Sequence, residues 1–369
     1  MSDRWHIITD VEQLPTPALV IYPDRVDENL RRMIEIAGGV SRLRPHVKTH
    51  KMPDMVRRQL ALGITKFKCA TIAEAEMVAD CGAADVMLAY QPVGPNAKRL
   101  AQLAAAFPKT KFSALVDDEG AARQLSAAMV AAGQTVEVLI DVDVGMHRTG
   151  IEPGPAAVAL YRLIASLPGL KPGGLHIYDG HIRAIDVRER TDLAAAAFAG
   201  ADGLKRALVA EGLPVPRMVA GGTPTFAIHA KREDLECSPG TCVFWDHSYG
   251  TKFDDLQFLP AALLVTRVVS RPAKNRVCLD LGFKAVSPDN ADPRVHLLDL
   301  PDAKAVVHSE EHLAVESPAA GNLAVGDVVY GVPFHICPTC ALYSEALTIE
   351  GGRVTGAWPI VARDRRLTV

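Results

Sequence analysis

The 369-residue sequence lacks both kinds of segment that direct a chain into or across a membrane. Residues 1–6 include no apolar secretory stretch, and no uninterrupted apolar run approaches the roughly 20 residues that span a bilayer. We therefore expect a cytoplasmic protein with no membrane partner.

The sequence also has little excess charge and no paired pattern of cysteines. Its 40 Lys and Arg residues nearly balance 43 Asp and Glu residues, and the net charge of −3 gives no electrostatic footprint for nucleic acid. Seven cysteines, an odd number, are scattered along the chain and suit a reducing compartment better than a disulfide framework. We therefore expect a small molecule as the ligand, and any special cysteine as a metal ligand or a thiol.

Over residues 43–240, short β-rich runs alternate with longer helical patterns rich in Ala and Leu. Eight runs are expected strands, at residues 44–48, 66–70, 85–89, 112–116, 136–142, 174–178, 217–221 and 235–238. The helical patterns between them, such as residues 96–107 and 192–211, are long enough for parallel crossovers. This alternation predicts an α/β fold of the closed (β/α)8 TIM-barrel type. An open doubly wound sheet is the competitor, but no Gly-x-Gly-x-x-Gly follows the first run.

After about residue 258 the helical patterns stop. Short β-branched runs follow at residues 262–270, 276–281, 294–298, 313–315, 327–331 and 353–361. They predict a C-terminal antiparallel β domain, as expected for a chain longer than the roughly 250 to 300 residues at which one core stops growing. A further β-rich run at residues 18–22 precedes the barrel pattern.

Lys48 lies directly after the first expected strand, in a basic run that spans residues 44–51. An amine is a covalent catalyst only when it is neutral, and we expect partial burial and nearby cations such as Arg44 and Lys51 to lower the pKa of Lys48. Lys48 is therefore a candidate Schiff-base lysine. A basic surface loop is the alternative.

Two loops rich in glycine and hydroxyl groups follow the seventh and eighth expected strands. They are Gly-Gly-Thr-Pro-Thr at residues 221–225 and Ser-Pro-Gly-Thr at residues 238–241. In barrels of this type a phosphate often binds after strands seven and eight. Backbone N–H groups and hydroxyls at both strand ends therefore indicate a phosphate site, although each loop alone would be an ordinary turn.

Three further residues at expected strand ends are candidates for binding a ring. Arg148 follows the fifth strand, where it either bonds a ring nitrogen or a carboxylate, or pairs with Asp141 or Asp143. His176 and Tyr178 share one face of the sixth strand and can point into the barrel mouth, but a core histidine and a packed tyrosine are the alternatives.

His335 and Cys337 are candidate metal ligands, because i, i+2 spacing on a strand puts both side chains on one face. An imidazole and a thiolate suit zinc. A buried histidine beside an inert cysteine is one alternative. A redox Cys-x-x-Cys pair of Cys337 and Cys340 is another.

As a set, these motifs resemble the D-threonine aldolase and D-serine dehydratase family of fold-type III pyridoxal-phosphate enzymes, which are related to alanine racemase. The motifs that carry the resemblance are residues 15–18, residues 44–51, the two glycine-containing loops and residues 333–339.

The resemblance implies a role for each candidate. Lys48 would form the Schiff base with pyridoxal 5'-phosphate, Arg148 would face the pyridine nitrogen, and Tyr178 would lie near the cofactor with His176. The phosphate would be held by Gly222, Thr223, Gly240 and Thr241. It also implies a barrel over residues 24–257, a β domain formed by residues 1–23 with residues 258–369, and a homodimer with the site near the subunit interface.

For His335 and Cys337, the resemblance implies a divalent metal, zinc, manganese or magnesium, that holds the substrate's β-hydroxyl. Aldolases of the family have a carboxylate at the position of Cys337, whereas His-x-Cys resembles the zinc-dependent D-serine dehydratases. Residues 280–284 and 309–312, with Asp280 and His312, also resemble family motifs that reach the site. An exposed charged turn is the alternative for both.

The leading hypothesis is a lyase that cleaves Cα–Cβ of D-3-hydroxy amino acids to glycine and an aldehyde, with a metal-bound water or His181 as the base. The alternative enzyme is a D-serine or D-3-hydroxyaspartate dehydratase that yields a 2-oxo acid and ammonia. The third hypothesis is a non-catalytic pyridoxal-phosphate-binding protein, but the roughly 110 residues after Phe258 argue against it.

Overall fold

The computed structural model describes residues 4–292 and 294–369 and divides the chain into two compact units. The barrel unit comprises Met33–Lys48, Met55–Gly240 and Asp364–Val369, and the β unit comprises Met1–Arg32, Thr49–Asp54 and Thr241–Arg363. In the described part of the chain, no helix has the length and apolar character needed to cross a membrane.

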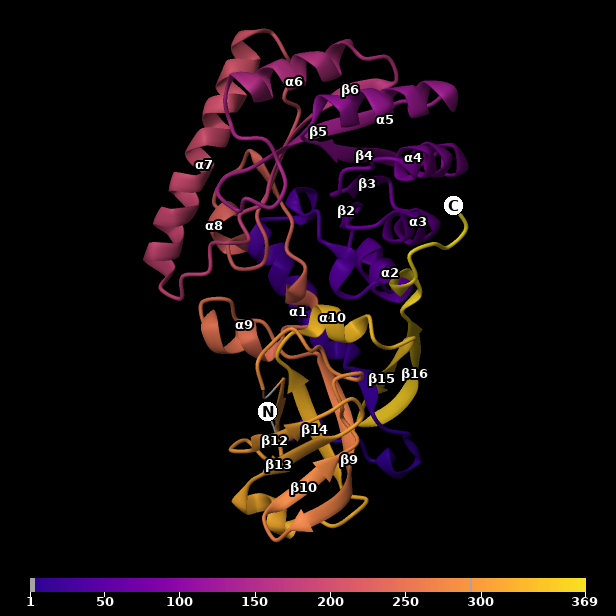
Figure 1. Ribbon diagram of the computed structural model, residues 1–369, viewed down its shortest axis with the longest axis vertical. Helices are drawn as coiled ribbons and strands as arrows, with labels where there is room; N and C mark the ends of the chain where they lie inside the picture. Colours follow the sequence, from indigo (N-terminus) through magenta and orange to yellow (C-terminus); the bar gives the residue numbers. More distant parts are fainter. Residues whose placement is uncertain (1–3, 293) are drawn as a thin grey trace. The chain divides into compact units, whose positions relative to one another are not determined.

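The barrel unit is built on a parallel sheet of seven strands in the order β2-β3-β4-β5-β6-β7-β8 (Figure 1). Their bounds are β2 Lys66–Cys69, β3 Asp85–Leu88, β4 Lys111–Val116, β5 Val136–Val142, β6 Leu170–Ile177, β7 Met218–Ala220 and β8 Leu235–Cys237. Most of their side chains are buried, as is typical of parallel strands covered on both faces. The predicted barrel-type α/β fold is confirmed, with seven regular strands instead of eight.

The expected first strand, at residues 44–48, is the exception. Leu43 and His46 form isolated parallel bridges to Cys237 and Lys68, so this segment pairs with β8 on one side and β2 on the other. A regular ladder is not possible because Pro45 has no N–H donor, and Val47–Thr49 already turn into a 3-10 helix. The segment therefore joins the two edges of the sheet without being a strand.

The helices of the barrel unit follow the strands, and Figure 1 shows α3 to α7 on the outer side of the sheet. Their starts have ordinary chemical signals: the side chains of Thr71, Asp118 and Asp186 cap α3, α5 and α7, and α4 and α6 begin with proline. The helices that belong wholly or mostly to the barrel unit are α2 Pro53–Ala61, α3 Ile72–Asp80, α4 Pro95–Ala106, α5 Glu119–Ala131, α6 Pro155–Ser166, α7 Val187–Ala210 and α8 Phe226–His229. Helix α1, Pro23–Ala37, belongs to the β unit up to Arg32 and to the barrel unit from Met33.

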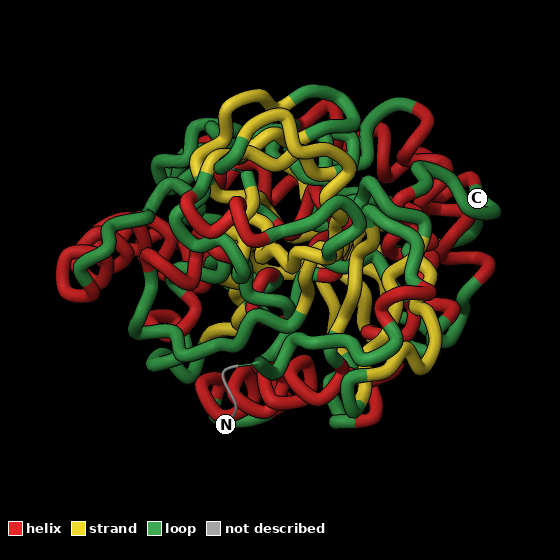
Figure 2. Tube along the Cα trace, turned by 90° about the horizontal axis from the view of Figure 1, so that it is seen from below, coloured by secondary structure: helices red, strands yellow, loops and turns green. Residues whose placement is uncertain are grey.

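The C-terminal residues belong to the barrel unit, and Figure 2 shows the C-terminus beside helices. Arg99 of α4 donates a hydrogen bond to Val369 O at 2.8 Å, and Glu76 of α3 accepts one from the Thr368 amide at 2.9 Å. These contacts hold the last residues of the chain against α3 and α4.

The β unit contains a mostly antiparallel sheet in the order β12-β13-β10-β9-β1-β15-β16, with β14 paired to both β9 and β11. Strand β1, the run that precedes the barrel pattern, pairs with β9 and β15. The buried core of the β unit includes Val20, Leu263, Val265, Val332 and Ile349. The elements are β1 Ala18–Ile21, β9 Ala262–Ala273, β10 Arg276–Leu279, β11 Val295–Leu297, β12 Lys304–His308, β13 Leu313–Glu316, β14 Val328–Pro333, β15 Glu345–Glu350 and β16 Arg353–Pro359, with short helices α9 His247–Lys252 and α10 Ile336–Cys340.

The expected antiparallel β domain is therefore confirmed, but β12 and β15 were not predicted.

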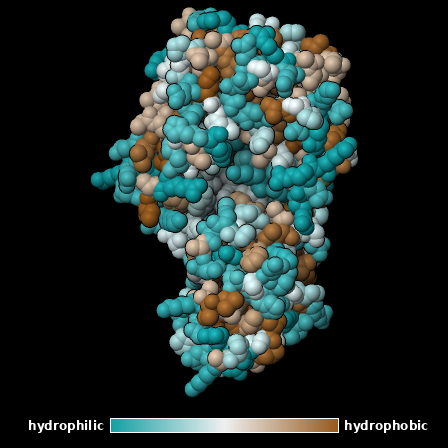
Figure 3. All heavy atoms as spheres, viewed as in Figure 1, coloured by the Kyte–Doolittle hydropathy of each residue, from teal (hydrophilic) through white to brown (hydrophobic). Residues whose placement is uncertain are grey.

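On the face drawn in Figure 3, hydrophobic side chains are scattered among hydrophilic ones, as is usual for the surface of a globular protein.

Candidate active site

Lys48 follows the segment that joins β8 to β2, and its side chain is half-buried in the barrel unit. The Lys48 Nζ atom lies 6.0 Å from the centroid of the Tyr178 ring. Arg44, which the sequence suggested as a nearby cation, is fully buried, with its guanidinium 2.7 Å from both Asp85 and Glu236. A cation that the sequence analysis did not consider, Lys68, interacts with the charge of Lys48.

The Tyr178 ring lies in a narrow space against two glycines. A β-carbon at Gly222 would lie 3.1 Å from Tyr178 Cε2, and one at Gly180 would overlap the Tyr178 ring. Three cations surround the ring, because Lys68 Nζ is 5.7 Å and Arg148 Cζ is 4.9 Å from its centroid, in addition to Lys48. The structure therefore brings together Lys48, Arg148, Tyr178 and Gly222 as the sequence predicted.

The two predicted phosphate loops also meet. The Gly240 amide, after β8, donates a hydrogen bond of 3.3 Å to Thr223 Oγ1, after β7. Ser238 Oγ, at the start of the second loop, bonds Gly221 O of the first at 3.1 Å. Amides and hydroxyls from both strand ends therefore converge in one region of the barrel unit.

His176 is buried and makes a hydrogen bond of 2.7 Å through Nδ1 to Asp141 Oδ1. Burial raises the pKa of Asp141, but hydrogen bonds from His176, Thr149 and Gln91 outweigh it and hold that pKa at about 2. Asp141 is thus ionised and can only accept, which assigns the donor hydrogen to His176 Nδ1. Burial, followed by the charge of Lys68, lowers the pKa of His176, so its Nε2 carries a lone pair. Within the described residues this Nε2 atom is buried and has no hydrogen-bond partner.

Arg148 does not form the ion pair that was its alternative. Asp141 bonds His176, and Asp143 is paired with His147 at 2.9 Å. Arg148 is exposed and lies over the Tyr178 ring instead.

His181, the candidate base, is an exposed residue of the loop after β6. A β-carbon at Gly145 would lie 3.1 Å from His181 Nε2, so the imidazole rests on the loop after β5. The same loop after β6 contains Asp179, which is buried with Oδ2 2.6 Å from His229 Nε2 and Oδ1 2.9 Å from Thr225 Oγ1. Asp179 thereby links the Tyr178 loop to the first phosphate loop.

Sequence reasoning missed Lys68, and it treated Asp141 only as a partner for Arg148. A signal for Lys68 was available. Lys66 and Lys68 alternate with apolar residues in an expected buried strand, and a lysine near the end of such a strand must point into the barrel or be paired. Asp179 and His229 gave no comparable pattern, because they are 50 positions apart.

The β unit contains His335 and Cys337. The expectation of a strand here is wrong, because β14 ends at Pro333 and His335 is the residue before α10, whose first turn includes Cys337. The two side chains nevertheless interact, because Cys337 is one of the groups that raise the pKa of His335. Asp289 Oδ2 is hydrogen-bonded to His335 Nδ1. Thr49 Oγ1 and Thr241 Oγ1 lie 3.2 Å and 3.5 Å from Cys337 Sγ.

Burial lowers the pKa of His335, but the interactions with Cys337 and Asp289 outweigh this and raise it to about 9. Across residues 4–292 and 294–369, no group of three or more His, Cys, Asp or Glu side chains is arranged to hold a metal ion. In the described part of the chain, His335 and Cys337 are thus two candidate metal ligands.

The motifs at residues 280–284 and 309–312 lie side by side in the β unit. Lys284 Nζ is 2.6 Å from Glu310, and the Phe283 amide donates to Ser309 O at 2.9 Å. Asp280 accepts hydrogen bonds from Thr16 at 2.5 Å and from Thr266 at 2.6 Å. Asp280 therefore ties together parts of the β unit.

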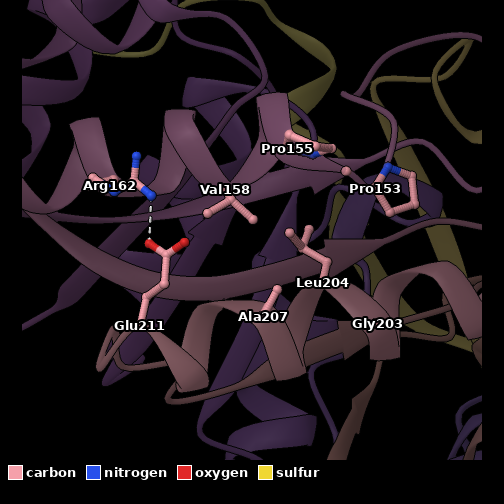
Figure 4. Close-up of a pocket in the computed structure, with 9 residues that line it drawn as sticks. Pro153, Pro155, Val158, Arg162, Gly203, Leu204, Ala207 and Glu211 are labelled. Atoms are coloured by element: carbon pink, nitrogen blue, oxygen red, sulfur yellow. Dashed lines mark hydrogen bonds and ion pairs between the residues drawn. The ribbon is translucent and has the colours of Figure 1, made fainter.

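A separate cavity of about 520 Å³ lies between α6 and α7 (Figure 4). Val158, Leu204 and Ala207 line it, and the ion pair of Arg162 with Glu211, at 2.6 Å, closes one end. It contains none of the predicted site residues.

The chain matches two known family models, the alanine racemase N-terminal domain over residues 21–248 and a serine dehydratase domain over residues 261–349. The D-threonine aldolase of Arthrobacter sp is 32% identical over 357 residues, which cover 95% of this chain and 93% of that protein. The D-threo-3-hydroxyaspartate dehydratase of Delftia sp. (strain HT23) is 30% identical over 370 residues, which cover 92% of this chain and 95% of that protein.

Solved structures show the same likeness. The D-threonine aldolase of Filomicrobium marinum superposes with a TM-score of 0.89 at 32% identity, over 96% of this chain and 97% of that one. The Delftia dehydratase superposes with a TM-score of 0.84 at 27% identity, over 95% of this chain and 98% of that one. Two variants of a D-threo-3-hydroxyaspartate dehydratase have also been solved. One has a histidine replaced by alanine, and the other, in a metal-free form, has a cysteine two positions later replaced by alanine. The resemblance drawn from the motifs is confirmed: the chain belongs to the alanine-racemase-like family of lyases that includes D-threonine aldolases and D-threo-3-hydroxyaspartate dehydratases.

Proposed function

We propose that this lyase cleaves the Cα–Cβ bond of D-3-hydroxy amino acids and releases glycine and an aldehyde, with pyridoxal 5'-phosphate as its cofactor. The family is pyridoxal-phosphate-dependent. The observation that carries the proposal is the convergence of Lys48, the Tyr178 ring and the two linked loops in one region of the barrel unit.

The residues in this region fit the cofactor. A phosphate dianion needs several N–H and O–H donors, which Gly222, Thr223, Gly240 and Thr241 would supply. The buried, unpartnered Nε2 of His176 and the cations around Tyr178 indicate a polar and anionic ligand. Lys48 would hold the cofactor covalently, and Arg148 would face its ring nitrogen.

Bound pyridoxal phosphate supplies an electron sink for the pair of electrons released when a bond at Cα breaks. The chain's own residues bind and orient the cofactor and the substrate. Tyr178, fixed between Gly180 and Gly222, provides a flat apolar surface, and Asp141 keeps the His176 ring in one orientation through Nδ1. His181 is exposed and can accept the proton of the substrate's β-hydroxyl.

We infer that His335 and Cys337 hold a divalent metal. Their donor atoms, an imidazole nitrogen and a sulfur, suit zinc, and a carboxylate on the other ring nitrogen, as Asp289 provides, is the usual support of a metal-binding histidine. Such an ion would act as a Lewis acid for the β-hydroxyl. Thr49, whose hydroxyl contacts Cys337 Sγ, directly follows Lys48 in the chain.

A second candidate function, the dehydration of D-serine or D-3-hydroxyaspartate, is favoured by the thiol of Cys337. The Delftia dehydratase is a relative of this chain, and a cysteine-to-alanine variant of a D-threo-3-hydroxyaspartate dehydratase has been solved in a metal-free form. In this reaction Lys48 would remove the α proton and the metal would assist the departure of the hydroxyl, giving a 2-oxo acid and ammonia.

Product analysis with D-threonine separates the two functions. Acetaldehyde with glycine supports the aldolase, and 2-oxobutanoate with ammonia overturns it in favour of the dehydratase. The same assay is run on D-serine and D-3-hydroxyaspartate, before and after treatment with a chelator. Unchanged turnover after complete removal of metal would contradict the role of His335 and Cys337.

We also infer a cytoplasmic homodimer, as the resemblance implies. Equilibrium sedimentation of the purified protein tests the assembly, and a mass of one chain of 39.6 kDa would contradict it.

A further inference from the structure

Lys68 is a buried amine that the proposed reaction does not use. It lies near the end of β2, and only 3% of its surface is exposed. Within the described residues, the side-chain amine makes one hydrogen bond, of 3.1 Å, with the neutral hydroxyl of Ser238. Within residues 4–292 and 294–369, no carboxylate forms an ion pair with it.

The two carboxylates whose charges act on Lys68 have other partners. Asp141 accepts hydrogen bonds from His176, Thr149 and Gln91. Asp179 accepts hydrogen bonds from Thr225 and His229. Neither is within ion-pair distance of the Lys68 amine.

The other charged groups that act on Lys68 make its charge less favourable. Burial lowers the pKa of Lys68 most, and the positive charge of Lys48 lowers it next. Together with Arg148, these effects outweigh the opposite effects of Asp141 and Asp179, and the pKa of Lys68 falls to about 7. Neutral His176 and the Tyr178 ring also lie beside it. A buried ammonium without a counter-ion is costly, so such a lysine either loses its proton or gains an anion from a ligand.

Two contacts indicate which ligand supplies the anion. Lys68 Nζ and Lys48 Nζ are 5.7 Å and 6.0 Å from the same Tyr178 ring, so both amines lie beside that ring. Ser238, the partner of Lys68, begins the loop at residues 238–241 and bonds Gly221 O of the other phosphate loop at 3.1 Å. The amine of Lys68 is therefore tied to the base of both loops.

We propose that Lys68 is the counter-ion of the cofactor's phosphate group and supports it through Ser238, whereas Lys48 alone makes the covalent bond. This proposal rests on the proposed function, because the anion is that of pyridoxal phosphate. Lys68 is then a positioning residue that takes up a proton when the phosphate binds. At pH 8 the free amine is mostly neutral, so binding is accompanied by uptake of about one proton at this residue.

The experiment uses pyridoxine 5'-phosphate, which has an alcohol in place of the aldehyde and so cannot bond Lys48. The full-length apoprotein is titrated calorimetrically at pH 8 in two buffers of different ionisation enthalpy, which gives both the affinity and the number of protons taken up. The variants are Lys68→Met and Lys68→Arg. Lys66→Met is the matched control, because Lys66 lies on the same strand but pairs with Glu236 at 2.6 Å.

We expect Lys68→Met to bind pyridoxine 5'-phosphate at least about tenfold more weakly and to lose the proton uptake of the native protein. Lys68→Arg, which keeps a permanent charge, should retain most of the affinity without the uptake. It also provides the decisive comparison if Lys68→Met does not fold. Lys66→Met should match the native protein in both measurements.

Native affinity and native proton uptake in Lys68→Met, or native proton uptake in Lys68→Arg, would overturn the proposal. An equal loss of affinity for pyridoxine, which has no phosphate, would also overturn it. Failure of the native protein to bind either pyridoxine 5'-phosphate or pyridoxal phosphate would instead refute the proposed function.

Discussion

Asp179 Oδ2 lies 2.6 Å from His229 Nε2, and this buried pair connects the loop after β6 to the short helix α8 that follows the first phosphate loop. The second oxygen of Asp179 accepts a hydrogen bond from Thr225 within the phosphate loop itself. Because Tyr178 directly precedes Asp179, a single carboxylate fixes both the aromatic surface and one wall of the proposed phosphate site. A buried carboxylate with these partners is difficult to replace.

We expect Asp179→Ala to release bound cofactor faster and to lower the free energy of unfolding by about 3 kcal/mol, because it leaves His229 buried without its partner. Dialysis of the holoprotein and urea unfolding measure the two effects. Asp202→Asn is the control, since Asp202 pairs with Arg232 near the surface and should cost under about 1 kcal/mol. Equal cofactor retention in both variants would show that Asp179 does not position the site.

Gly222→Ala tests the contact of the first phosphate loop with Tyr178. The added β-carbon would lie 3.1 Å from Tyr178 Cε2, so the ring or the loop must shift. We expect a loss of cofactor affinity of about fivefold to 150-fold, which corresponds to a misfit of about 1 to 3 kcal/mol. Gly203→Ala on α7 puts the new methyl group 3.9 Å from the Arg206 guanidinium, an ordinary contact, and should bind cofactor normally. Normal binding by Gly222→Ala would contradict the proposed packing.

Removal of the Cys337 thiol tests the proposed metal site. We expect Cys337→Ala, purified and dialysed without chelator, to lose the metal that the native protein retains, as measured by elemental analysis. Cys340→Ala is the matched control, because Cys340 is buried three positions later and burial raises its pKa. Equal metal content in native protein and Cys337→Ala would rule out the cysteine as a ligand.

The hydrogen bonds to Asp141 predict a pH dependence of stability. Its pKa is about 2 in the folded protein and 3.8 ordinarily, so the folded state favours the ionised form. The resulting stabilisation, about 2 kcal/mol, is fully present above pH 4 and is lost as the pH falls towards 2. Urea unfolding between pH 7 and pH 3 should therefore show a shallower loss of stability for Asp141→Asn than for the native protein. Parallel curves would contradict this assignment.

Much of the barrel unit could be predicted, because strand ends in a parallel sheet all carry short, recognisable loops. The residues at these ends, Lys48, Arg148, Tyr178 and Gly222, lie together as expected. The first strand could not be predicted correctly, since Pro45 interrupts a run that otherwise has the composition of a strand.

Long-range pairing explains the other errors. The partners of Arg44 and Asp179 are up to 192 and 50 positions away, and no local pattern identifies them. His335 and Cys337 interact as expected, but they do not lie on a strand. They can face each other because His335 is the residue before a short helix and Cys337 lies in its first turn. Strand β12 was missed since most of its residues are exposed and it lacks a buried face.

The proposed function depends on a covalent bond between Lys48 and pyridoxal phosphate. The most direct test is borohydride reduction of the protein after incubation with pyridoxal phosphate, followed by mass spectrometry of its peptides. We expect the phosphopyridoxyl group on the peptide that contains Lys48 and not on the peptide that contains Lys68, and no labelling of either in Lys48→Ala. Labelling at Lys68, or an unlabelled Lys48, would contradict it.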